Sequence, residues 1–173
     1  QYTNENNLNK EYIKKIKLNV KSFEINKDSL DIITTENLLQ NEINKKVLNK
    51  LEAWAWQKFA IEGMENKAIL KLLENDLSLV EKRKHKKSIL SIIQQGKEVY
   101  KITLNFNLYL TANDSLIKTL KITSSLDFVL LNKYSITQRD KAIIYNVNKL
   151  IKLIDDKVTF QLSNKAFDKF VIK

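Results

Sequence analysis

The sequence predicts an α+β domain in which a single antiparallel sheet of about four strands carries two long helices packed on one face. Three observations predict this class. Apolar residues recur at the helical period over 35–63 and again over 137–162. Apolar and polar residues alternate strictly over 99–110, which is typical of an antiparallel strand with one face in water. A shorter alternating run covers 13–25 and predicts a half-buried strand.

The first helix is expected to span 35–63, with a cap at Thr34 or Thr35 and its end at Gly63 in the left-handed conformation. Its apolar stripe consists of Leu39, Ile43, Val47, Leu51, Trp54, Ala55 and Ile61. Trp54 and Trp56 stand two residues apart and therefore face nearly opposite sides of a helix. We expect Trp54 in the core and Trp56 at its edge.

The segment 68–82 fits either a helix or two short strands separated by the irregular stretch Glu74–Asp76. Strands are the preferred interpretation, because a helix packed on a sheet needs several strands to cover it. The alternating run 99–110 and the segment 116–131 are expected to form a hairpin around a turn with Asn-Asp at its centre. A bulge is expected near Ser124 and Ser125.

The second helix follows Thr137–Asp140, which resembles a capping box with Asp in place of Glu, and runs to about Leu162. The tail, 163–173, predicts a short turn that docks Phe167 and Phe170 on the body of the domain.

Length and composition are those of one domain. The 173 residues include 43% hydrophobic residues, enough for a core without disulfides, and no cysteine. Residues 1–12 are polar and are expected to be a flexible segment ahead of a single domain at 13–173. No run of about 18 apolar residues occurs, so no transmembrane segment is expected. The chain starts at Gln1, and any signal peptide or lipid anchor is expected upstream of it.

The formal charge of +10 raises the possibility of nucleic-acid binding. Two observations weaken it. Only Arg83 and Arg139 are arginines, the residue that best contacts phosphates and bases. Lysine, asparagine and isoleucine are also frequent along the whole chain, as an AT-rich coding sequence would produce.

No catalytic or cofactor-binding pattern is present. His85 stands alone in a lysine run, where neither a metal ion nor a proton is favoured. Asp155 and Asp156 are neighbours about 100° apart on a helix and are expected on its solvated face. With Gly63 and Gly96 as the only glycines, no phosphate-binding loop can form. The sequence predicts a protein that is not an enzyme and has no cofactor.

The connection 82–97 is the least ordinary segment of the chain. It begins with a run of cationic side chains and continues with a short aliphatic patch. A loop carries four aliphatic residues when they pack under the domain, touch a partner or enter lipid. Packing under the domain is the simpler interpretation, and contact with a partner or lipid is the functional one. The candidate contact residues are Lys84, Lys86, Lys87, Ile89, Leu90, Ile92 and Ile93.

A further set of residues is spaced in a familiar order. It comprises Leu51, Trp54, Ala55, Gly63, Ala68, the segment 77–81, Tyr100, Ser135, Arg139, Leu150, Leu153 and Asp156. This order resembles a group of uncharacterised alphaproteobacterial, Rickettsia-like envelope proteins. The element order is also similar to small outer-membrane lipoproteins that assist lipopolysaccharide assembly or lipid transport. The resemblance covers about 13–162 and implies an envelope-facing accessory protein.

These observations favour a non-enzymatic accessory protein that is periplasmic or outer-membrane-associated, provided that a signal peptide exists upstream. Its expected partner is an envelope protein or a lipid. The alternatives are a nucleic-acid-binding module that uses the lysine-rich surface, or a scaffold subunit of a secretion system.

Overall fold

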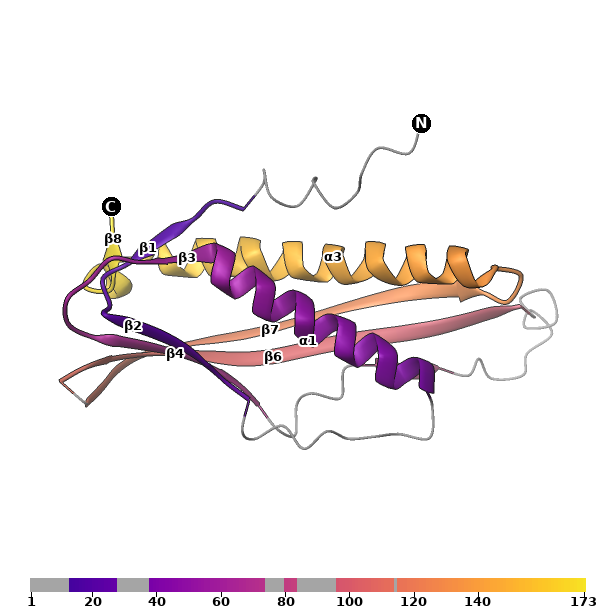
Figure 1. Cartoon of the computed structure of the whole chain (residues 1–173), viewed down its shortest axis with the longest axis horizontal. Helices are drawn as coiled ribbons and strands as arrows, with labels where there is room; N and C mark the ends of the chain where they lie inside the picture. The colour runs from indigo at the N-terminus through magenta and orange to yellow at the C-terminus, as the bar shows by residue number, and fades with distance from the viewer. Residues whose placement is uncertain (1–12, 28–37, 74–79, 84–95, 114) are drawn as a thin grey trace.

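The computed structural model describes residues 13–27, 38–73, 80–83, 96–113 and 115–173, and Figure 1 gives the arrangement of their elements. Two long helices and eight strands make up this part of the chain, so the α+β class is confirmed. In chain order the elements are β1 (Ile16–Leu18), β2 (Ser22–Asn26), α1 (Leu38–Lys58), β3 (Phe59–Ile61), β4 (Lys67–Leu72), β5 (Val80–Arg83), β6 (Lys97–Ala112), β7 (Ser115–Leu131), α3 (Ile136–Leu162), the 3-10 turn η1 (Lys165–Phe167) and β8 (Val171–Ile172).

The larger sheet is built on the long hairpin of β6 and β7, as the alternation predicted. The two strands pair from Lys97 opposite Leu131 to Ala112 opposite Ser115. β4 and β5 pair with successive parts of the other edge of β6, and β2 then pairs with β4 in parallel. The two strands expected within 68–82 are confirmed as β4 and β5. The irregularity in the hairpin lies between Leu110 and Thr111, so the bulge predicted at Ser124 and Ser125 is wrong.

A second, three-stranded sheet corrects the predicted architecture. β1 pairs in parallel with β3 and antiparallel with β8, giving the order β3-β1-β8. The predicted strand 13–25 is therefore two strands in two sheets. Between them the backbone N–H of Asn19 donates to Phe170 O at 2.8 Å and that of Lys21 to Glu65 O at 2.7 Å, which turns the chain from one sheet to the other. The fold has two mixed sheets rather than one antiparallel sheet.

Helix α1 ends earlier than the sequence predicted. It stops at Lys58, because Phe59–Ile61 continues directly as β3 beside β1. Gly63 is therefore not the helix stop, and among the described glycines only Gly96 has a positive φ, of 129°. Gly63 instead lies against the backbone of the β1–β2 connection, where its N–H donates to Val20 O at 3.0 Å. The predicted cap at Thr34 or Thr35 lies outside the described residues.

Helix α3 has its capping box two residues before the predicted one. Ser135 is the N-cap, its hydroxyl accepts from Gln138 N, and the Gln138 side chain accepts from Ser135 N, so this pair forms the capping box. The predicted end at Leu162 is confirmed. α3 runs beside β7, where Lys157 Nζ donates to Thr123 O at 2.6 Å (Figure 1). A helix along an edge strand protects its backbone groups from pairing with another chain.

One hydrophobic cluster joins all layers. The buried stripes of α1 and α3 and the buried alternate residues of β6 and β7 belong to it, together with Phe170 from the tail. The expected docking of the tail is confirmed, since Phe170 is fully buried and Phe167 packs against the cluster. β8, which follows directly, completes the small sheet at the end of the molecule where α3 finishes (Figure 1).

Candidate functional site

The contact surface predicted from the sequence lies outside the described residues. Its members are Lys84, Lys86, Lys87, Ile89, Leu90, Ile92 and Ile93, and His85 lies in the same segment. The strands that bound it are described: β5 ends at Arg83 and β6 begins at Lys97, with Arg83 paired to Val99. The segment thus joins two neighbouring antiparallel strands, and its role as a contact site stays a prediction.

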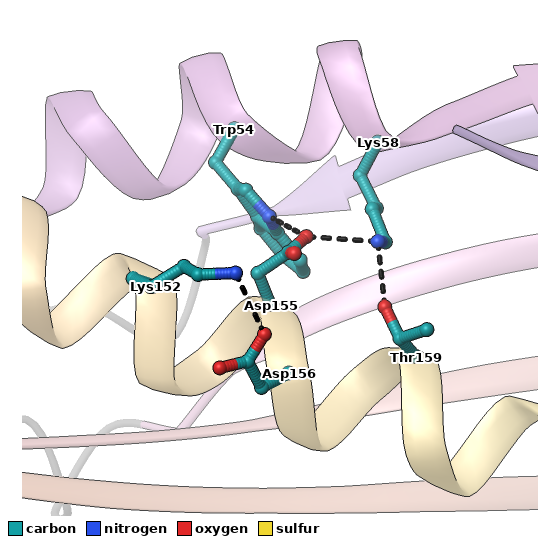
Figure 2. Close-up of polar contacts among 6 residues, drawn as sticks. All are labelled: Trp54, Lys58, Lys152, Asp155, Asp156 and Thr159. Atoms are coloured by element: carbon teal, nitrogen blue, oxygen red, sulfur yellow. Dashed lines mark hydrogen bonds and ion pairs between the residues drawn. The ribbon is translucent and has the colours of Figure 1, made fainter. Parts of the chain in front are cut away.

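A buried polar cluster ties α1 to α3 (Figure 2). Lys58 Nζ lies 2.8 Å from Asp155 Oδ1 and 2.7 Å from Thr159 Oγ1. Trp54 Nε1 donates to the same Asp155 oxygen at 2.9 Å. The Lys58 side chain is 0% exposed and that of Asp155 7%, so the carboxylate and ammonium groups depend on each other and on these two neutral partners.

The two adjacent aspartates have opposite environments. Asp155 is buried in the cluster, so the prediction that both acids lie on the solvated face of the helix is wrong for Asp155. Asp156 does lie on that face, where it pairs with Lys152 at 2.9 Å (Figure 2). This hydrogen bond raises the pKa of the Lys152 ammonium. The geometry of the buried cluster, in which one carboxylate of α3 accepts from Trp54 and pairs with Lys58 of α1, is that of a structural link between the two helices.

The tryptophans occupy the positions that the sequence predicted. Trp54 is 1% exposed and packs against Phe59 and Phe106. Trp56 is 54% exposed and meets the edge of Phe23 at a centroid distance of 5.1 Å. One ring thus anchors the core and the other covers its margin.

A second polar cluster lies where β6 begins. The Tyr100 hydroxyl donates to Glu98 Oε2 at 2.7 Å, and Arg139 Nη2 lies 3.4 Å from the same oxygen. The Tyr100 ring stacks on Phe128 at 5.5 Å. Burial raises the pKa of the Tyr100 hydroxyl, and the hydrogen bond to Glu98 and its negative charge raise it further, while Arg139 lowers it.

Replacing Tyr100 should change how stability depends on alkaline pH. The folded state holds the phenol proton more tightly than the unfolded chain, whose tyrosine pKa is about 10. The stability that this difference contributes is complete below about pH 10 and is lost as the pH rises from there towards the folded-state pKa. Urea unfolding of Tyr100→Phe should therefore show a shallower decline above about pH 10 than the wild type. Tyr145→Phe, at an exposed side chain, controls for loss of a phenol; parallel declines in Tyr100→Phe and wild type would contradict the assignment.

A pocket opens between the small sheet and the C-terminal end of α3. It encloses about 490 Å³, a volume within the range of small-molecule sites. Aliphatic side chains and lysines dominate its lining, and no acidic side chain is among the described residues that form it. The lining residues are Lys14, Lys15, Ile16, Lys17, Thr159, Leu162, Ser163, Val171, Ile172 and Lys173. Sequence reasoning missed this pocket, because its three segments are brought together only by the pairing of β1 with β8.

Two of these lysines already have partners. Lys17 lies 3.9 Å from Glu62 and Lys173 lies 3.0 Å from Asp168, with both pairs largely exposed. Lys14 and Lys15 are exposed and form no ion pair within the described part of the chain. Among the described residues they are therefore the lining lysines without a counter-charge.

A smaller pocket of about 270 Å³ lies beside Met64 at the turn after β3. Its lining is polar and combines Glu65 with Lys21 and Lys67. Opposite charges so close together select neither an anion nor a cation, and the pocket suggests no ligand class.

The described residues contain no group of three or more histidine, cysteine, aspartate or glutamate side chains that could hold a metal ion. Neither described helix is long and apolar enough to cross a membrane.

Comparison with known proteins yields solved structures only. No protein-family model matches the sequence, and no curated protein matches it. The crystal structure of rare lipoprotein B from Shewanella oneidensis is similar over 82% of this chain and 94% of its own, with 10% identity and a TM-score of 0.40. A minor lipoprotein from Acinetobacter baumannii is similar over 87% of this chain and 95% of its own, with 10% identity and a TM-score of 0.36. At these TM-scores the similarity assigns neither a family nor a function to the chain.

Proposed function

We propose that the protein is a non-enzymatic accessory protein of the cell envelope that binds the surface of anionic membranes. The observation that carries the proposal is the charge at the end of the molecule formed by β1, β3, β8 and the tail. Residues 13–18, 59–62 and 163–173 contain six lysines against Glu62 and Asp168, an excess of four positive charges. All six lysines are exposed; they are Lys14, Lys15, Lys17, Lys165, Lys169 and Lys173.

Membrane binding by such a surface combines charge with apolar contact. Each lysine near an anionic bilayer contributes about 1 kcal/mol, so an excess of four contributes about 4 kcal/mol at low salt. Exposed apolar side chains belong to the same end: Phe160 is 79% exposed and Ile172 is 38% exposed. Aromatic and aliphatic groups of this kind enter the lipid headgroup region.

Sedimentation with vesicles tests the proposal. The purified chain should bind vesicles that contain phosphatidylglycerol, should bind vesicles of phosphatidylcholine alone much less, and should dissociate as salt is raised. Replacing Lys165 and Lys169 by glutamate should weaken binding, whereas the same change at Lys45 and Lys149, exposed on α1 and α3, should weaken it less. Equal binding to neutral vesicles, or no binding at low salt, would overturn the proposal.

Location is tested separately in cells. The full-length protein should float with membranes in a density gradient, and recovery only in the cytosol would contradict an envelope role.

Duplex DNA serves as the competing ligand in the vesicle assay. Salt-dependent DNA binding stronger than vesicle binding would favour the nucleic-acid alternative.

A further inference from the structure

We infer that the pocket between β1, β8 and the end of α3 binds a single-chain anionic amphiphile of the fatty-acid class. The inference deepens the proposed function, on which it rests, by naming a ligand that this end of the molecule takes out of the lipid phase. Three features of the pocket carry it: its aliphatic floor, its lysine rim and its position.

The floor consists of side chains from three elements. Leu162 closes the last turn of α3 and is 2% exposed, and Ile16 and Val171 come from the paired strands β1 and β8. An alkyl chain lying over them removes apolar surface from water on both sides, which is favourable in proportion to the area covered. The volume of about 490 Å³ accommodates a ligand of this size.

The charges on the rim select the head group. Four lysine side chains and no acidic side chain are among the described residues that line the pocket, and Lys14 and Lys15 have no ion pair within the described residues. A carboxylate head placed between them gains charge-assisted hydrogen bonds. A neutral head of the same length can accept a hydrogen bond but forms no ion pair, and a cationic head is repelled by the lysines.

The end of α3 sets the orientation of the ligand. The last carbonyl groups of a helix carry partial negative charge, which disfavours an anion placed directly against Leu162 and Ser163. The geometry therefore assigns the carboxylate to the side of Lys14 and Lys15 and the alkyl chain to the side of Leu162. Glu62 and Asp168 are paired with the lining residues Lys17 and Lys173.

Titration of the purified chain with soluble fatty acids, each below its micelle concentration, tests the inference. Affinity should rise about fourfold per added methylene from octanoate through decanoate to laurate. Lauryl alcohol and dodecylammonium should bind at least about tenfold more weakly than laurate, because neither of them forms an ion pair with Lys14 and Lys15. Equal affinity for the acid and the alcohol, or affinity independent of chain length, would overturn the inference.

Variants locate the site. Lys14→Glu with Lys15→Glu should lower laurate affinity at least about tenfold, whereas the matched pair Lys45→Glu with Lys149→Glu, far from the pocket, should leave it unchanged. Ser163→Trp, at an exposed position of the pocket lining, should fill the pocket and abolish binding while the circular dichroism spectrum stays that of the wild type. If laurate binds Ser163→Trp as tightly as the wild type, the ligand site is not this pocket.

The vesicle assay separates this inference from the proposed function. Binding to anionic vesicles without binding of laurate would overturn the inference and leave the proposed function standing. Binding of laurate without binding to vesicles would overturn the proposed membrane binding and leave the fatty-acid site standing.

Discussion

Asp155→Asn should destabilise the protein by about 3–5 kcal/mol, because it leaves the Lys58 ammonium buried without its counter-charge. The asparagine oxygen can still accept from Trp54 Nε1, so the loss reports chiefly on the charge. The same oxygen, which lies 2.8 Å from Lys58 Nζ in the wild type, can still accept from Lys58 beside Thr159 Oγ1, so Lys58 loses its counter-charge and not its hydrogen-bond acceptors. Urea unfolding at neutral pH measures the change in the free energy of unfolding.

A second variant and a neighbouring control separate charge from packing. Lys58→Met combined with Asp155→Asn removes both charges, keeps the acceptor for Trp54, and should recover most of the stability that Asp155→Asn loses. Asp156→Asn makes the same chemical change one residue away, at a pair whose side chains are 58% and 60% exposed, and should cost less than about 1 kcal/mol. A loss at Asp155 no larger than that at Asp156 would show that the buried pair is not needed.

Gly63→Ala should cost about 3 kcal/mol, the upper part of the range for forcing extra atoms into a packed site. A Cβ at this position would stand 2.3 Å from Val20 N and 2.4 Å from Asn19 C. Both are backbone atoms in the turn between the two sheets, so no side chain can rotate away to relieve the clash. The expected result is a lower urea midpoint with an unchanged slope.

Ala53→Gly provides the comparison for Gly63. Ala53 is exposed on α1, and its replacement changes only the intrinsic helix preference, by about 1 kcal/mol. If Gly63→Ala costs no more than Ala53→Gly, the close approach to Val20 is not a constraint on the fold. The left-handed conformation predicted from the sequence would have given a cost as well, but from backbone strain rather than from contact.

The candidate site shows what periodicity can find and where it stops. The stripe Ile43, Val47, Leu51, Trp54 continues at helical spacing to Lys58, and this regular spacing was the one available signal that a lysine is buried. Asp155 lies beside the stripe of α3 rather than on it. Nothing in the chain between positions 58 and 155 indicates that the two charges meet, since their pairing depends on how α1 and α3 pack.

By itself the sequence determined the two long helices, the hairpin of β6 and β7 and the burial of Trp54. Each of these follows from a local period, because one face of the element must be apolar to join the core. The pattern of the segment that forms β4 and β5 also fits a helix, and only the need to cover a packed helix favours strands there. The start of α3 was predicted to within two residues, because a capping box joins residues only three apart in the chain. The observed box is Ser135 with Gln138 instead of Thr137 with Asp140.

Only the tertiary structure decided that the fold has two sheets and that the pocket exists. Strands β1, β3 and β8 have three, three and two residues, too few for a period to be recognised, and their partners lie more than 40 residues away in the chain. The same distances hide the close approach of Gly63 to Val20. Contacts between distant short segments have no local pattern, because they are selected by the packing of the whole chain and not by their neighbours in sequence.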